Sequence, residues 1–137
     1  MSKKILLLFS LTFILFSCKE DCYTHPDSVV FEFVNSHGEN LIQNGSLPTF
    51  SIQEEAVNGV SAGVQLTKTD DHKVKLERVG SFNGTKNYRF FSAIRFFDFS
   101  IRSSPVTTEC DGFQIDHIEF DSISSTKEDK FYRIVLE

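Results

Sequence analysis

The chain has 137 residues, of which 40% are apolar and 24% are charged, and its formal net charge at pH 7 is −5. Taking residues 1–17, with their two lysines, from the 14 basic and 19 acidic residues leaves 120 residues with a net charge of −7. A chain of this length holds one domain-sized core. The acidic balance argues against a nucleic-acid partner, because a face that binds nucleic acid must be cationic to displace counterions from phosphate.

The first segment, Met1–Ser17, has the plan of a secretory signal peptide. Lys3 and Lys4 precede an almost wholly apolar run from Ile5 to Phe16. This run is shorter than the about 20 apolar residues that a helix needs to span a bilayer, and a charged sequence follows it directly. We therefore expect export and cleavage rather than a membrane span.

The end of this segment, Leu15-Phe16-Ser17-Cys18, resembles a bacterial lipobox, in which the cysteine is acylated and becomes the new N-terminus. Phe16 is larger than the residue that usually stands two positions before that cysteine. The resemblance implies that Cys18 is the lipidation site and that its acyl chains anchor the protein in a membrane. The alternative is an ordinary signal peptide, cut near Ser17, that leaves a free secreted protein.

Lys19-Glu20-Asp21 directly follows Cys18 and resembles the export signal of surface lipoproteins in the Bacteroidota phylum. The resemblance implies a small, uncharacterised surface-exposed lipoprotein of that phylum, held on the outer face of the outer membrane. Residues 18–27 would then be a lipidated tether and residues 28–137 a single β domain. The alternative is a charged tether that holds a periplasm-facing domain.

Two cysteines, Cys22 and Cys110, remain once Cys18 carries lipid. In an exported protein they can form a disulfide that closes a long loop. Two free thiols or a metal site are the alternatives, and a metal site is disfavoured because neither cysteine belongs to a CxxC pair.

The remaining composition favours an all-β fold. After residue 17 the chain holds 12 Phe, 3 Tyr and 18 Val or Ile, against 5 Leu and 3 Ala, and branched and aromatic side chains fit pleated sheets. Turn sequences such as Asn44-Gly45-Ser46 separate the apolar runs. We predict eight strands, at Val29–Val34, Ser51–Gln53, Val64–Thr67, Lys73–Val79, Asn87–Phe91, Ile94–Ile101, Phe113–Phe120 and Lys130–Leu136.

This spacing of strands predicts an antiparallel β-sandwich of about seven or eight strands, immunoglobulin-like or transthyretin-like, with a small closed β-barrel as the alternative. The alternation in Lys73–Glu77 places Val74 and Leu76 inward. Both faces of the last run are largely apolar, which predicts a central strand. We also expect one helical turn at Gln53–Val57.

Two structures compete for Tyr88–Ile101, because its apolar residues fit both a strand and a helical stripe. Five of its fourteen residues are Phe and only one is Ala, which favours a strand. A strand of that length exceeds the usual limit of about ten residues. We therefore predict a turn or bulge near Ser92-Ala93.

Catalytic and metal-binding patterns are weak. The four histidines are scattered, so zinc signatures of the HExxH type are absent, and Asp70-Asp71-His72 fits a solvated turn between lysines. The acidic residues between Glu109 and Asp121 lack the spacing of an EF-hand calcium loop. No serine stands in a GxSxG sequence. We predict no catalytic residue, no cofactor and no metal.

Two triplets, Asp27-Ser28-Val29 and Asp121-Ser122-Ile123, resemble the O-glycosylation acceptor of exported Bacteroidota proteins. The resemblance implies Ser28 and Ser122 as acceptors. Both lie at predicted strand edges, where a sugar would remain in solvent.

The largest concentration of aromatic residues lies between Phe90 and Phe99. Packing between two sheets is the default expectation for such side chains. The alternative is an exposed strip of Phe91, Phe97 and Phe99 that stacks on sugar rings or covers an apolar ligand, with neighbouring arginines as hydrogen-bond donors.

Together these features predict a non-catalytic lipoprotein, lipid-anchored in the outer membrane and displayed on the cell surface, that acts as a β-sandwich binding or interaction module. Its partner would be a glycan, a protein or a small molecule. A lipid-anchored carrier of a small apolar ligand in a β-barrel is the alternative, and a small hydrolase is a weaker one.

Overall fold

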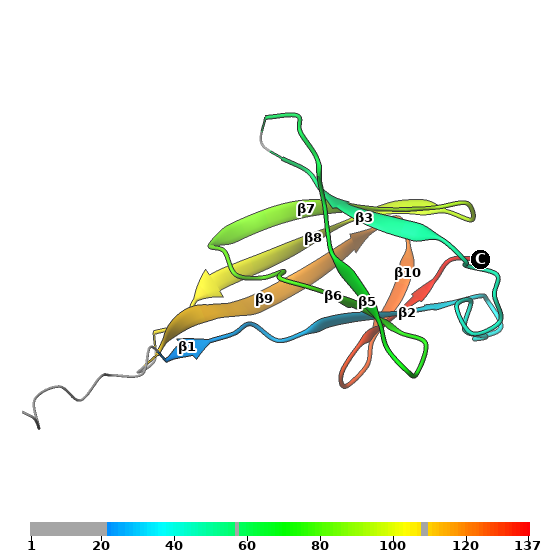
Figure 1. Cartoon of the computed structure of the whole chain (residues 1–137), viewed down its shortest axis with the longest axis horizontal. Coiled ribbons are helices and arrows are strands. Elements are labelled where there is room, and N and C mark those ends of the chain that lie inside the picture. The colour runs from blue at the N-terminus through cyan, green and yellow to red at the C-terminus, as the bar shows by residue number, and fades with distance from the viewer. Residues whose placement is uncertain (1–21, 57, 108–109) are drawn as a thin grey trace, which may run out of the picture.

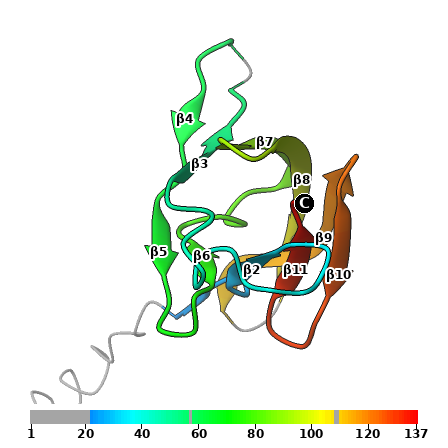
Figure 2. The same ribbon diagram turned by 90° about the vertical axis from the view of Figure 1, so that its right-hand side faces the viewer.

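The computed structural model describes residues 22–56, 58–107 and 110–137, which form eleven strands in two sheets and contain no helix (Figure 1). The six-stranded sheet contains, in spatial order, β1 (Tyr23–Thr24), β9 (Asp111–Asp121), β8 (Phe96–Pro105), β7 (Gly84–Ser92), β3 (Phe50–Glu54) and β4 (Ala62–Gly63). The five-stranded sheet contains β10 (Ser124–Lys127), β11 (Tyr132–Val135), β2 (Val29–Val34), β6 (Val74–Leu76) and β5 (Leu66–Lys68). Figure 2 shows the two sheets enclosing the interior of the domain.

The all-β prediction is confirmed, and its details need correction. Each of the eight predicted runs overlaps a strand, but the short strands β1, β4 and β10 were not predicted. The pairs β1–β9 and β2–β11 run parallel, so both sheets are mixed rather than antiparallel. The arrangement therefore differs from the predicted immunoglobulin-like or transthyretin-like sandwich. Within the described residues the two sheets share no ladder, so the predicted closed barrel is not formed either.

The stretch Tyr88–Ile101 is strand on both sides of a turn, as predicted. β7 ends at Ser92, whose hydroxyl oxygen accepts hydrogen bonds from two backbone N–H groups of the turn, and β8 begins at Phe96. In this hairpin Phe91 lies opposite Phe96. Odd-numbered residues of β7 therefore share a face of the sheet with even-numbered residues of β8.

The core lies between the two sheets and consists largely of aromatic rings. The ring centroid of Phe31, on β2, lies 5.3 Å from that of Phe99 on β8 and 5.6 Å from that of Phe120 on β9. The rings of Phe33 and Phe90 join the same two sheets at 4.8 Å. Edge-to-face and tilted ring pairs of this kind add to the stabilisation from apolar burial.

Two predictions for the five-stranded sheet are confirmed, and one for the neighbouring sheet is wrong. Val74 and Leu76 are buried, and the last predicted strand, β11, occupies a central position between β10 and β2. The helical turn predicted at Gln53–Val57 does not form, because β3 continues through Glu54 to pair with β7. Val57 itself lies outside the described residues.

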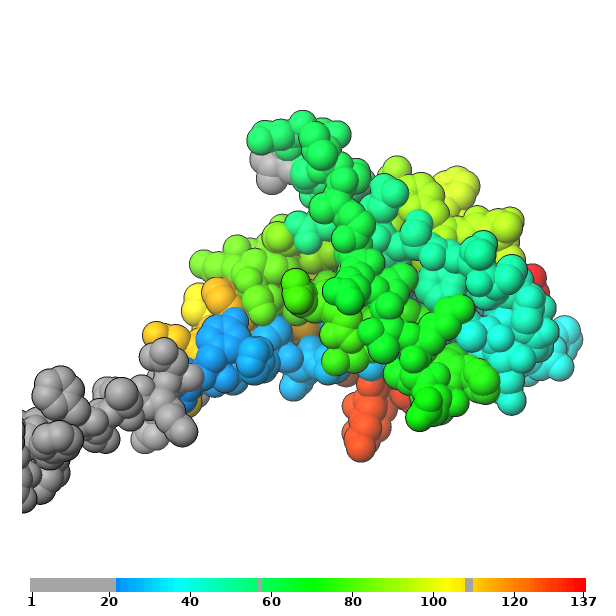
Figure 3. Space-filling view, viewed as in Figure 1, coloured from blue at the N-terminus to red at the C-terminus, as the bar shows by residue number. Residues whose placement is uncertain are grey.

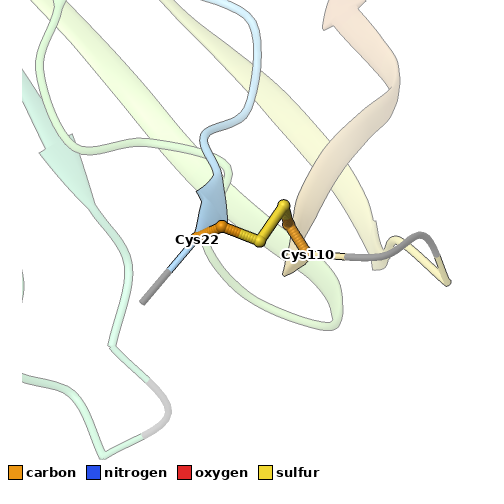
Figure 4. Close-up of a disulfide and its surroundings, with 2 residues drawn as sticks. All are labelled: Cys22 and Cys110. Atoms are coloured by element: carbon orange, nitrogen blue, oxygen red, sulfur yellow. A yellow bond between two sulfur atoms is a disulfide. The ribbon is translucent and has the colours of Figure 1, made fainter. Parts of the chain in front are cut away.

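The disulfide predicted between Cys22 and Cys110 is confirmed, with an S–S distance of 2.04 Å and a Cα–Cα distance of 5.1 Å (Figure 4). The disulfide joins the residue before β1 to the residue before β9. Gly112 of β9 lies opposite Thr24 of the parallel strand β1, and a Cβ at position 112 would overlap the carbonyl oxygen of Thr24. A glycine is therefore needed for the two backbones to approach. The start of the described chain, at Cys22, is thus fixed to one end of the six-stranded sheet.

Candidate functional site

The outer face of the six-stranded sheet carries two exposed aromatic side chains. Phe96, at the start of β8, is 73% exposed, and its cross-strand partner Phe91, at the end of β7, is 38% exposed. A single exposed apolar side chain is ordinary on a protein surface. Two that lie opposite each other on one pleated face form an apolar platform, which we call the aromatic pair.

The predicted exposed strip is wrong at two of its three residues. Phe97 and Phe99 are only 4% and 3% exposed, and they belong to the core between the sheets, which was the default expectation. The strip treated Phe91, Phe97 and Phe99 as one continuous odd-numbered face. The hairpin turn reverses that parity and brings Phe96 to the surface beside Phe91. The turn predicted near Ser92-Ala93 is the signal from which Phe96 could have been found.

An ion pair follows the aromatic pair along the same face. Arg89 donates two parallel hydrogen bonds to the Asp98 carboxylate, from Nε at 2.5 Å and from Nη2 at 2.8 Å, and its Nη2 lies 3.7 Å from Glu55 Oε1. The hydrogen bonds from Arg89 hold the pKa of Asp98 below its ordinary value, and the same contact raises the pKa of Arg89. Both groups therefore stay charged at neutral pH, in a fixed fork geometry.

A shallow groove of about 310 Å³ opens next to this ion pair on the same face. Its polar side chains come from neighbouring strands: Asn87 of β7 lies opposite Ser100 of β8, and Asp98 lies opposite Asp121 of β9. The lining residues are Glu55, Asn87, Asp98, Phe99, Ser100, Glu119, Phe120 and Asp121. The groove is thus rich in hydrogen-bond acceptors, with the Arg89 guanidinium at its border.

A second groove, of about 410 Å³, lies on the five-stranded sheet between the β5–β6 and β10–β11 turns, which project side by side in Figure 3. The Lys73 ammonium lies 4.6 Å from the centroid of the Phe131 ring and also pairs with Asp71. The hydrogen bond from Lys73 lowers the pKa of Asp71. Lys73 thus contacts both Phe131 and Asp71 within the groove. The lining residues are Val30, Thr69, Asp71, Lys73, Asp129, Lys130 and Phe131.

A polar contact also lies at the junction of β3 and β7. Lys86 donates a hydrogen bond to Glu54 at 2.6 Å, and Glu54 is the cross-strand partner of Tyr88. Burial raises the pKa of the Tyr88 phenol, and the negative charge of Glu54 raises it further. Tyr88 therefore stays neutral at all ordinary pH values and acts as a packing residue of the core.

The other predicted sites are not among the lining residues of these grooves, although the Ser122 hydroxyl donates a hydrogen bond to Asp121, which lines the first groove. Ser28 and Ser122 are exposed, as O-glycosylation requires, and Ser122 occupies the turn between β9 and β10. Their glycosylation stays a prediction. Within residues 22–56, 58–107 and 110–137, no group of three or more His, Cys, Asp or Glu side chains is arranged to hold a metal ion. Glu109 lies outside this part of the chain.

The predicted leader Met1–Ser17, the lipidation site Cys18 and the export signal Lys19-Glu20-Asp21 all lie outside the described residues. Among the residues that the structure does describe, no helix has the length and apolar character needed to cross a bilayer. No family model, curated protein or solved structure matches the chain.

Proposed function

We propose that this protein is a non-catalytic, lipid-anchored binding module of the bacterial cell surface, and that its outer membrane anchor leaves the outer face of the six-stranded sheet free for a ligand. The observation that carries the proposal is the aromatic pair, Phe91 and Phe96, which is exposed beside a polar groove. Apolar and aromatic surface next to a few convergent polar groups is typical of binding sites. The lipobox resemblance at Cys18 supplies the anchor.

The distance between the aromatic pair and the tether supports a role in binding from the cell surface. Cys22 closely follows Cys18 in the sequence, and the disulfide holds it at Cys110. β8 has ten residues, from Phe96 to Pro105. Pro105 pairs with Phe113, near the start of β9, and so lies at the disulfide end of the sheet. Ten strand residues span about 30 Å. The aromatic pair is therefore remote from the lipidated end of the chain, where a large extracellular ligand has access.

The chemistry of the groove supports binding rather than catalysis. A general acid needs a pKa near the working pH, which usually requires burial of the carboxyl group or a second carboxylate close by. Asp98 has the opposite environment, because the Arg89 guanidinium stabilises its charged form. A carboxylate held in this way accepts hydrogen bonds but does not donate a proton at neutral pH.

The alternatives from the sequence stay predictions with less support. A carrier of an apolar ligand needs space between the sheets, and there the rings of Phe31, Phe99 and Phe120 lie in mutual contact. A small hydrolase needs an activated nucleophile or an acid–base pair, for which the groove offers no specific support. A periplasm-facing orientation differs from surface display only in the side of the outer membrane on which the domain lies.

Cell fractionation with Cys18→Ala tests the anchor. We expect the unaltered protein in the outer membrane fraction and the variant in the soluble fraction, while Ser28→Ala, a change at another exposed position, stays with the membrane. Protease added to intact cells should degrade the anchored protein. Retention of Cys18→Ala in the outer membrane fraction would refute the anchor, and protection of the protein from protease would refute surface display.

A further inference from the structure

We propose that the outer face of the six-stranded sheet binds a neutral glycan chain, with the aromatic pair stacking against one sugar ring and the groove hydrogen-bonding to its neighbours. This inference rests on the proposed function as a surface-anchored binding module. It adds the chemical class of the ligand and the residues that recognise it.

The aromatic pair suits the apolar side of a sugar ring. Phe96 leaves 73% of its surface in water, although the same strand buries Phe97 and Phe99 almost completely. Exposure of a ring at this level costs apolar hydration free energy that a stacked partner would recover. The C–H groups on one face of a pyranose are such a partner, and the cross-strand position of Phe91 and Phe96 presents both rings on one face of the sheet.

Hydrogen-bonding side chains begin two residues along each strand from the aromatic pair. Arg89 and Asp98 are the next outward residues on β7 and β8, about 7 Å along the strands, and Asn87 and Ser100 follow at the same spacing. Amide and hydroxyl side chains both donate and accept hydrogen bonds, as sugar hydroxyls do. A glycan chain laid along the β7–β8 hairpin would therefore meet an apolar platform first and paired donors and acceptors next.

The charges of the groove select against anionic ligands. Of its four carboxylates, Asp98 and Glu55 face the Arg89 guanidinium, whereas the described ion pairs do not include Glu119 or Asp121. The surplus of negative charge repels uronate, sulfate and phosphate groups. A neutral sugar instead presents hydroxyl donors to these acceptor oxygens without any charge to desolvate.

A basic peptide is the competing ligand for an acidic groove. At the Asp98 end of the groove its ammonium or guanidinium groups would meet the Arg89 cation, which lies at the border of the groove and already uses Asp98. Asn87 and Ser100 carry no charge to attract such groups. The mixture of neutral donors and acceptors beside the ion-paired Arg89 favours the neutral glycan.

Binding measurements with the full-length lipoprotein in detergent micelles test this inference. The probes are soluble neutral β-glucan, mannan and galactan, with polygalacturonate as an anionic polysaccharide and oligolysine as a basic peptide. We expect at least one neutral polysaccharide to bind and polygalacturonate not to bind. Phe96→Ala should weaken that binding about five- to tenfold, the loss of one stacking contact.

Val60→Ala is the matched control, because Val60 is 72% exposed and lies away from the β7–β8 hairpin. It should leave binding unchanged. Arg89→Ala should also weaken neutral polysaccharide binding, since it frees Asp98 from its fixed position. Thermal unfolding of each variant should show that the fold is retained, as expected for exposed side chains.

Three results would overturn the inference: none of the neutral polysaccharides binds, binding survives Phe96→Ala unchanged, or oligolysine binds through Phe96 while the polysaccharides do not. In each of these cases fractionation of Cys18→Ala still decides whether the protein is an anchored surface module. The failure of the glycan inference is therefore distinguishable from the failure of the proposed function.

Discussion

The adjacent residues Phe96 and Phe97 provide a direct test of which side of β8 faces the core. Phe97 is 4% exposed, and its ring centroid lies 4.9 Å from that of Phe90 and 6.3 Å from that of Phe120. Burial of about 200 Å² of aromatic surface at about 25 cal/mol per Å² stabilises the fold by about 5 kcal/mol. Phe97→Ala should therefore lower the free energy of unfolding by about 3–5 kcal/mol.

Phe96→Ala removes the same atoms one position earlier on the strand. Phe96 is 73% exposed, so about a quarter of its surface is buried, and the expected loss is about 1 kcal/mol. Urea unfolding followed by near-ultraviolet circular dichroism measures both values. With a slope of about 2 kcal/mol per molar urea, the midpoint should fall by about 2 M for Phe97→Ala and by only about 0.5 M for Phe96→Ala. Equal losses, or a larger loss for Phe96→Ala, would show that the faces of β8 are assigned the wrong way round.

Three further outcomes are expected. Replacing Cys22 and Cys110 with serine should lower the free energy of unfolding by about 4–5 kcal/mol, because the disulfide joins residues 88 positions apart and so restricts the unfolded chain. A loss under about 1 kcal/mol in urea unfolding would contradict this entropic effect. Asp98→Asn should cost under about 1 kcal/mol at neutral pH, since its ion pair is more than 40% exposed. The folded state lowers the pKa of Asp98 from 3.8, so its contribution is present above that pH and is lost as the pH falls through the lowered pKa. The difference in unfolding free energy between Asp98→Asn and the unaltered protein should therefore shrink on acidification, and a difference that grows would contradict the lowered pKa. Gly112→Ala should lower the stability by about 1–3 kcal/mol, because the new methyl group meets the backbone of β1, whereas Gly63→Ala, with open space around it, should unfold at almost the same urea concentration as the unaltered protein.

The strands with strong local patterns could be predicted from the sequence. Val29–Val34 forms β2 with the predicted bounds, since its branched and aromatic residues suit a pleated, half-buried strand. Ser124–Lys127 has no such pattern, and all four residues are exposed. It forms β10 only because it pairs with β11, which is a tertiary contact that the local sequence does not encode.

The order of the strands and the parallel pairings depend on contacts between distant residues. Arg133 pairs with Glu32, which lies 101 positions earlier, because β11 returns to run parallel beside β2. No periodicity in the sequence reports such a contact. An exposed aromatic site was likewise predicted, but only Phe91 of its three residues is part of it. That Phe96 shares a face with Phe91 can be inferred only from the hairpin register between β7 and β8.

The most direct test of the proposed anchor and binding face is the retention of a fluorescently labelled neutral polysaccharide on intact cells that produce the protein. The cells should retain the label with the unaltered chain and with Val60→Ala, and should lose most of it with Phe96→Ala, which removes the platform, and with Cys18→Ala, which removes the anchor. Equal retention by the Phe96→Ala and Val60→Ala cells would contradict the assignment of the six-stranded sheet as the binding face.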